Sequence, residues 1–256
     1  MVAPSLDSMI SGPNRTIRLT AAAAMVLFLA ACGAKQVVVQ GKYPTPVIEK
    51  EELVLGIVFT ENFKNFEFFE DSKIQAEPDW RILIGQAQTE FWETFLSNTV
   101  TDLVVIDSHE ALHSTNKDIE FILIPYLDDL NYAIPMQTSS DRFEIWLKYR
   151  FRLVALSSIH DHNNGEISYN PNEYLAEWSF TAYGKTPELR EMTIEGFTQD
   201  DEESVNLAAV VALRDAGAHL ARLLKTESFT TRAAPARKTG KYNKEEPGND
   251  FTMDSN

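Results

Sequence analysis

Residues His109-Glu110-Ala111-Leu112-His113 match the H-E-x-x-H pattern of zinc proteases. In that chemistry, two histidines one helical turn apart bind one zinc ion, and the glutamate between them is the general base for the zinc-bound water. The pattern has this meaning when it lies on a helix. Here a strand-like run, Leu103–Ile106, precedes the match, and a turn-like run, Ser114–Asp118, follows it. We therefore expect two solvated histidines in a loop and no bound metal, and we keep a zinc hydrolase with ligands His109 and His113 as an alternative.

The other residues with catalytic side chains lack a spacing that would combine them. His160, Asp161 and His162 precede an Asn-Asn-Gly sequence, which is typical of a turn between two strands. The sequence contains no glycine-rich phosphate loop after its first strand and no nucleophile elbow. It therefore predicts no catalytic residue and no cofactor, and it favours a protein that acts by binding.

The composition is that of an acidic globular protein. The chain has 256 residues, of which 44% are hydrophobic, and its formal net charge is -15. This length suffices for one well-packed core with flexible ends. A nucleic-acid partner would require a basic surface, so the charge argues against that class of partner.

The only cysteine of the chain, Cys32, ends a segment that has three parts. Arg15 and Arg18 come first, an apolar run follows, and Leu-Ala-Ala directly precedes the cysteine. This order resembles the lipobox of bacterial lipoproteins, in which the signal peptide is cut before the cysteine and the cysteine is acylated. The resemblance implies a signal peptide over residues 1–31 and a lipidated Cys32, whose several acyl chains anchor the protein to a membrane.

The residue after the cysteine bears on which membrane is meant. It is Gly33, whereas an aspartate at this position favours inner-membrane retention in enterobacterial lipoproteins. The resemblance therefore implies the outer membrane of a Gram-negative cell, with the folded part facing the periplasm. A second cysteine for a disulfide is lacking, so the fold depends on its core alone. The sequence leaves open whether translation begins at Met1 or Met9.

The rest of the chain alternates between apolar runs with a strand period and apolar runs with a helix period. We expect strands at 53–59, 103–106, 119–124, 142–156 and 175–183, of which the third can resume past Pro125. We expect amphipathic helices at 79–99, with Asp79 as its cap, and at 200–225. Residues 32–52 predict a tether, and residues 227–256 predict a disordered tail. Over residues 53–226 the sequence predicts a periplasmic α+β domain. We expect a two-layer sandwich in which an antiparallel-dominated sheet of about four to five strands carries the two helices on one face.

Two features favour binding to a partner. The first is a basic strip with one aromatic residue, made by the outward positions of the long strand: Arg142, Trp146, Lys148, Arg150 and Arg152. It is either an ordinary solvated sheet face or a contact for an acidic partner or an anionic headgroup. The second is the loop before this strand, in which Ile134 and Met136 look exposed, and which is either a docking loop or a simple connection.

The order of lipobox, tether, strands and helices resembles that of small periplasmic lipoproteins that assist envelope transport. The lipopolysaccharide-assembly lipoprotein LptE and the auxiliary lipoproteins of ABC-type and MCE-type transport systems are similar in this layout. The stretches from Ile134 to Leu153, SFTAYGK at 179–185 and VNLAAVVALRDAGAHLA at 205–221 are similar to uncharacterised proteobacterial lipoproteins. The resemblance implies a lipid-anchored scaffold or accessory subunit of an outer-membrane assembly or envelope transport complex. A stand-alone lipid- or glycan-binding lipoprotein is the alternative, and the oligomeric state stays open.

Overall fold

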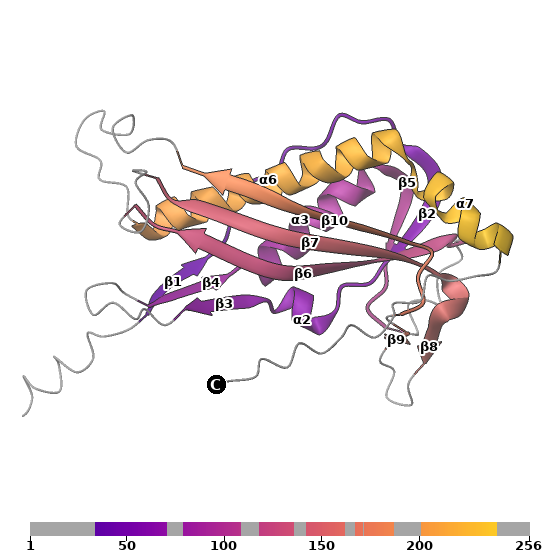
Figure 1. Ribbon diagram of the computed structural model, residues 1–256, viewed down its shortest axis with the longest axis horizontal. Helices are drawn as coiled ribbons and strands as arrows, with labels where there is room; N and C mark the ends of the chain where they lie inside the picture. Colours follow the sequence, from indigo (N-terminus) through magenta and orange to yellow (C-terminus); the bar gives the residue numbers. More distant parts are fainter. Residues whose placement is uncertain are drawn as a thin grey trace, which may run out of the picture.

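The computed structural model describes residues 34–70, 79–108, 118–135, 142–161, 167–170, 172–186 and 201–239 (Figure 1). The elements in chain order are β1 (Lys35–Val38), β2 (Glu51–Ile57), α2 (Glu61–Lys64), β3 (Glu67–Glu70), β4 (Trp80–Leu83), α3 (Gly85–Ser97), β5 (Val100–Val105), β6 (Phe121–Ala133), β7 (Glu144–Ala155), the short 3-10 helix η1 (Leu156–Ser158), β8 (Ile159–Asp161), β9 (Ile167–Tyr169), β10 (Ala176–Lys185), α6 (Asp201–Thr226) and α7 (Phe229–Thr239). None of the helices in these ranges is long and apolar enough to cross a membrane.

The main sheet has five strands in the order β10-β7-β6-β2-β5. The two longest pairings, of β7 with β10 and of β7 with β6, are antiparallel. The shorter pairings of β2 with β6 and with β5 are parallel. Because α3 and α6 cover one face of this sheet, the predicted two-layer α+β fold is confirmed (Figure 1).

The core lies between this sheet and the two helices. Phe143, just before β7, and alternate residues of β7 up to Leu153 point into it, as their spacing predicts. The side chain of Trp92 on α3 packs edge-on against Phe151, with ring centroids 4.7 Å apart. The buried Tyr149 hydroxyl donates a hydrogen bond of 2.9 Å to Gln88, so this buried phenol has a partner.

A second sheet of three strands, in the order β1-β4-β3, corrects two sequence predictions. The expected tether contains β1, which pairs in parallel with β4 and buries Val37. The expected helix at 79–99 begins only at Gly85, because Trp80 and Ile82 alternate inward in β4. Asp79 is therefore no helix cap, and its carbonyl accepts a hydrogen bond from the Lys35 N–H at 2.8 Å. A Cβ on Gly85 would lie 2.1 Å from the backbone oxygen of Lys64, so only glycine fits where the helix starts.

The chain after α6 is also structured, although the sequence predicts a disordered tail from residue 227. Phe229 and Ala233 of α7 are buried, and the Phe229 ring packs edge-on against Trp178 at 5.6 Å. Glu51 caps this helix, because its carboxylate accepts hydrogen bonds from the N–H groups of Phe229 (3.1 Å) and Thr230 (3.0 Å). The domain thus extends beyond the predicted boundary at 226. Residues 240–256 of the predicted tail lie outside the described residues.

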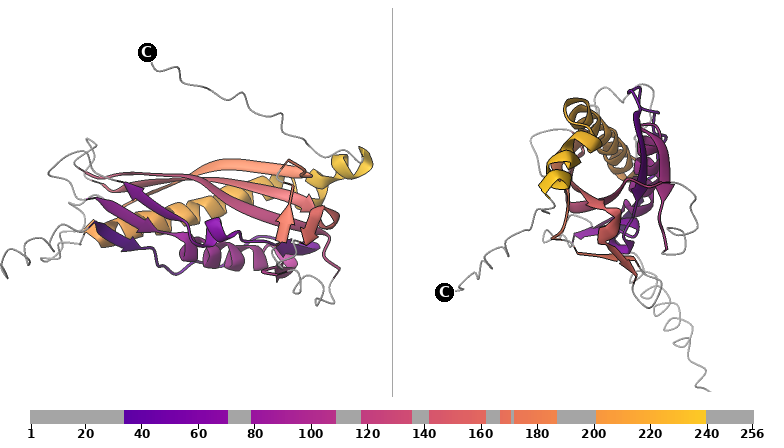
Figure 2. Two further views of the ribbon diagram at one scale, coloured as in Figure 1. Left: turned by 90° about the horizontal axis from the view of Figure 1, so that it is seen from below. Right: turned by 90° about the vertical axis from the view of Figure 1, so that its right-hand side faces the viewer.

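Helix α6 runs along the outer edge of β10 (Figure 2). The backbone N–H of Tyr183 donates a hydrogen bond of 2.9 Å to the carboxylate of Asp215 on α6. At the next residue, a Cβ on Gly184 would lie 2.0 Å from the backbone oxygen of Ala208. Helix and strand edge therefore approach as closely as their backbones allow.

Candidate binding surface

The face of the main sheet opposite α3 and α6 carries the outward residues of β6, β7 and β10, and we call it the outer face. It has two halves that follow one another along the strands. The covered half lies at the end of β7, where the small hairpin of β8 and β9 stands (Figure 1). The open half lies at the start of β7, where Trp146 and Lys148 face outward opposite Tyr183 and Thr181 of β10.

The covered half begins with a second, smaller apolar core. Its buried members are aliphatic and come from the strands and the segments beside them: Val58, Ile106, Ile119, Ile122, Ile124 and Val154. Ile159 of β8 and Tyr169 of β9 pack against this cluster. The hairpin therefore covers apolar outward residues that would otherwise be in water.

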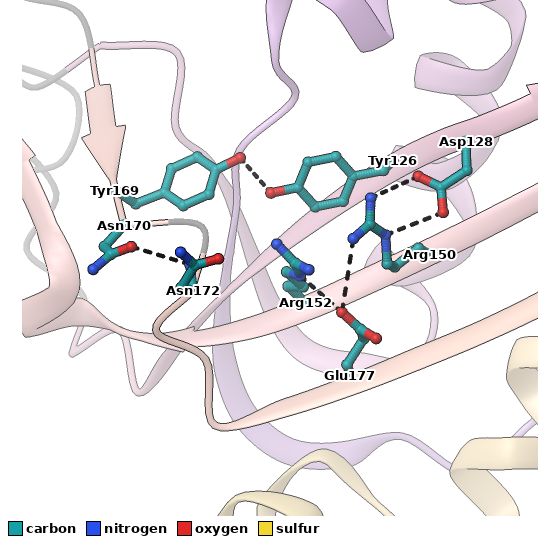
Figure 3. Close-up of polar contacts among 8 residues, drawn as sticks. All are labelled: Tyr126, Asp128, Arg150, Arg152, Tyr169, Asn170, Asn172 and Glu177. Atoms are coloured by element: carbon teal, nitrogen blue, oxygen red, sulfur yellow. Dashed lines mark hydrogen bonds and ion pairs between the residues drawn. The ribbon is translucent and has the colours of Figure 1, made fainter. Parts of the chain in front are cut away.

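Two arginines of β7 form an ionic network beside this cluster (Figure 3). Arg150 donates two hydrogen bonds to Asp128 of β6, at 2.8 and 3.1 Å. Arg152 donates one of 2.8 Å from Nε to Glu177 of β10, and Glu177 also lies 4.0 Å from Arg150. Two cations and two carboxylates thus neutralise one another. The Arg152 side chain is only 4% exposed, so its charge depends on this partner.

Tyrosines enclose the network. The guanidinium of Arg152 lies 5.6 Å from the ring centre of Tyr126 and 5.0 Å from that of Tyr174, a geometry that favours cation–π attraction. The hydroxyls of Tyr126 and Tyr169 form a hydrogen bond that ties β9 to β6 (Figure 3). Burial and this hydrogen bond raise the pKa of Tyr126 well above its usual value near 10, so the phenol stays neutral.

The predicted basic strip is therefore divided. Arg152 is buried rather than solvated, and both Arg150 and Arg152 are paired with carboxylates. Cross-strand register explains the difference, because it places Glu177 directly opposite Arg152. Arg142 is half-buried and has contacts of its own near Tyr183.

The open half retains the aromatic part of the strip. The half-buried rings of Trp146 and Tyr183 lie 5.3 Å apart at an angle of 31°. Lys148 beside them is exposed, and so is Thr181 opposite it. Burial and the carboxylate of Glu144 raise the pKa of Tyr183. Aromatic side chains with a polar tip in such a half-solvated setting are the kind that anchor protein interfaces.

The other predicted site residues fall elsewhere. Ile134, expected to be exposed, is only 5% exposed and belongs to the main core, because β6 ends just before it and turns it inward. Met136, Cys32 and the motif with His109 and His113 lie outside the described residues. Within the described ranges, no group of three or more His, Cys, Asp or Glu side chains could hold a metal ion.

The sequence prediction missed the partners that neutralise the arginines. Glu177 occupies an outward position of a strand that was expected, whereas Tyr126 and Asp128 lie in the part of β6 beyond the expected range of 119–124. For two of them the alternation indicates an outward position, since Glu177 precedes the inward Trp178 and Tyr126 follows the buried Pro125. Asp128 lies at the bulge between Leu127 and Asp129, where the alternation is interrupted. Which of them would meet which arginine depends on register, and the sequence does not show register directly.

Comparison with known proteins leaves the family open. No protein-family model matches the sequence, and no curated protein matches it. Among solved structures, a Xanthomonas campestris protein of the family DUF330 is similar with a TM-score of 0.43 and 10% identity, over 80% of this chain and 99% of the other. A proposed lipoprotein of Caulobacter crescentus CB15 is similar with a TM-score of 0.27 and 13% identity, over 50% of this chain and 76% of the other. A Helicobacter pylori protein described as a proposed homologue of the neuraminyllactose-binding hemagglutinin reaches a TM-score of 0.36 at 9% identity, over 79% and 100%. Likenesses at this level do not decide a function.

Proposed function

We propose that this protein is a lipid-anchored periplasmic accessory subunit or scaffold of an outer-membrane assembly or envelope transport complex, and that it acts by binding rather than by catalysis. The observation that carries the binding role is the open half of the outer face. There Trp146 and Tyr183 form an aromatic pair beside the exposed Lys148. A sheet face that no element of the described residues covers, with such an aromatic pair on it, fits a protein partner.

The charges of the open half favour a partner of a particular kind. Lys148 and Lys185 add positive charge, and Asp129 and Glu144 add negative charge within the same three strands. The surface is therefore mixed in sign, in contrast to the basic and partly aromatic strip that the sequence suggests. We expect a partner with an apolar centre and a polar rim, and we do not expect an acidic polymer.

The lipid anchor would hold this surface near the membrane. If Cys32 is acylated, β1 begins only three residues later, within about 10 Å of chain. The Trp80 ring lies beneath the Lys35 ammonium group of β1. The centre of the Trp80 ring is 6.1 Å from that of the Tyr132 ring, and Tyr132 of β6 pairs with Ile145 at the start of β7. Because β1 lies at the end of the molecule where the open half is, an acylated Cys32 would anchor that end (Figure 1).

Crosslinking in native membranes tests the binding role. A photoreactive residue in place of Thr181, at the centre of the open half, should give a discrete protein adduct. The adduct should be lost when Trp146→Ala is added and retained when Lys64→Ala, a change on the distant α2, is added instead. Adducts with lipid alone would contradict the accessory-subunit role.

Two further experiments address the sequence motifs. Cys32→Ser should abolish acyl labelling and leave an uncleaved precursor, whereas persistence of labelling would refute the lipid anchor. Purified protein should contain no stoichiometric zinc. Zinc that is lost on His109→Ala would overturn the binding role in favour of a zinc hydrolase.

A further inference from the structure

A pocket of about 720 Å³ lies at the C-terminal end of α6, and the outer face has no part in it. One side is a row of α6 residues, Ala218, Ala221 and Leu224, and the opposite side is the extended segment with Val47 and Ile48. The size is that of a small-molecule site. The Val47 side chain is fully exposed, although burying an aliphatic side chain is favourable.

Two charged residues of the pocket are already engaged with helix ends. Lys50 donates a hydrogen bond of 2.9 Å to the carbonyl of Ser97 at the end of α3. Glu51 caps α7 with both carboxylate oxygens, as described above. Each charge has the sign that the helix end beside it favours. The charges of Lys50 and Glu51 therefore have a structural role, which is to stabilise helix ends.

Two cations of the pocket have no such role. Arg222 and Lys225 lie three residues apart on α6 and are exposed, and their side chains form no hydrogen bond or ion pair with the described part of the chain. Glu49, also exposed, is the one carboxylate of the pocket lining that no helix end uses. The rim is thus positive in a protein whose net charge is -15. An anion would be attracted here and not to most of the surface.

We propose that this pocket binds a fatty acid or an amphiphile of the same chemistry. The carboxylate would pair with Arg222, whose planar guanidinium can donate two parallel hydrogen bonds, with Lys225 beside it. The alkyl chain would lie between the small α6 side chains and the Val47 and Ile48 side chains. Charge complementarity and an aliphatic lining both point to this class, since a free phosphate would leave the apolar part unused and a peptide would not require the paired cations.

This ligand site is independent of the proposed partner surface. It lies at the end of α6 that is distant from the Lys35–Asp201 ion pair, whereas the open half lies toward that ion pair. Figure 2 shows α7 and the β8–β9 hairpin at this same distant end. Loss of one site should therefore leave the other intact, and the two proposals can fail separately.

Photo-crosslinking with a fatty acid tests the site on the full-length protein. The probe is dodecanoic acid with a diazirine in the alkyl chain, added to protein in a nonionic detergent, with adducts mapped by mass spectrometry. We expect adducts in residues 47–50 and 218–225, competed by unlabelled dodecanoate. The variant Arg222→Glu/Lys225→Glu should reduce the yield at least fivefold.

A matched variant, Lys148→Glu/Lys185→Glu, changes the net charge equally but lies on the outer face, and it should retain full labelling in the pocket. Equal labelling by an alkylammonium probe of the same length would overturn the role of the two cations. Competition by acetate or phosphate as strong as that by dodecanoate would overturn the role of the alkyl chain. Adducts only outside the two segments would overturn the site itself. Circular dichroism of each variant verifies that the fold is kept.

Discussion

The covered and open halves of the outer face lie on the same three strands, but outward side chains such as that of Arg152 are buried in the first half, and those of the second half are partly exposed. In the covered half, Arg152 is 4% exposed, its charge is matched by Glu177, and a hairpin closes over the neighbouring aliphatic residues. In the open half, Trp146 and Tyr183 pack against each other, and Lys148 stays in solvent. The same outward alternation thus produces a second core at one end of the sheet and a half-exposed aromatic pair at the other.

The difference shows that position on a strand sets only which face a side chain occupies. Whether that face is buried depends on what lies above it, and here the β8–β9 hairpin supplies the cover. Buried charges require matched partners, and exposed ones do not. The covered half should therefore govern stability, while the open half should govern recognition.

The largest effect is expected from removing the buried guanidinium. Arg152→Ala leaves Glu177 without its close partner and should lower the free energy of unfolding by about 3 kcal/mol, measured by chemical denaturation. The double variant Arg152→Met/Glu177→Leu, which replaces both charges with apolar groups, should recover most of this loss. A single variant as stable as the wild type would show that the covered half is not a core.

A smaller effect is expected from alkaline pH. The native Tyr126 phenol keeps its proton to higher pH than an unfolded tyrosine does, so above pH about 10 the unfolded state loses the proton first and becomes favoured. Stability from this group is present below that pH and should fall by up to about 1.4 kcal/mol per pH unit above it. In chemical denaturation at increasing pH, Tyr126→Phe should make the free energy of unfolding fall less steeply with pH. Tyr183→Phe in the open half should have a smaller effect on this slope.

The hydrogen bond between the Tyr126 and Tyr169 hydroxyls, which ties β9 to β6, is expected to contribute about 1 kcal/mol to the free energy of unfolding. Tyr126→Phe, Tyr169→Phe and the double variant form a cycle whose coupling energy measures the hydroxyl pair. Amide hydrogen exchange should become faster in β8 and β9 in each single variant. Additive effects, with a coupling energy near zero, would show that the hairpin is held by apolar packing alone.

The smallest effect is expected in the open half. Lys148→Ala and Thr181→Ala should each change the free energy of unfolding by less than about 0.5 kcal/mol, because both side chains are exposed. Denaturation curves under the conditions used for Arg152→Ala give a direct comparison. A loss above about 1 kcal/mol would show that this half is covered in the native protein.

The fold class could be predicted because the strongest signals are long. The inward alternation extends from Phe143 to Leu153, and the helical spacing extends over 205–220. Patterns of this length distinguish a strand from a helix, which a short apolar run does not, and the structure confirms both. The short elements escaped prediction. β1 has four residues and pairs with a strand far along the chain, and Trp80–Leu83 fits a strand period as well as the start of a helix.

The candidate site was predicted only in part, for reasons of the same kind. Trp146 and Lys148 could be placed outward from their own strand. The burial of Arg152 could not, because it depends on Glu177 of β10, Tyr126 of β6 and a hairpin that the sequence shows only as a polar turn. The pocket at the end of α6 left no sequence signal, since its lining combines segments from three parts of the chain.

The contact between α6 and β10 has a consequence for solubility. An uncovered strand edge offers unpaired N–H and C=O groups to strands of other molecules and so invites aggregation. Here the Tyr183 N–H donates a hydrogen bond to the Asp215 carboxylate of α6. Because Gly184 has no side chain, α6 can pack closely against the edge of β10. A larger residue at 184 would push α6 away from its backbone contacts and leave the ten-residue β10 open to strand addition. The small size of Gly184 therefore lets α6 shield this part of the β10 edge from strand addition.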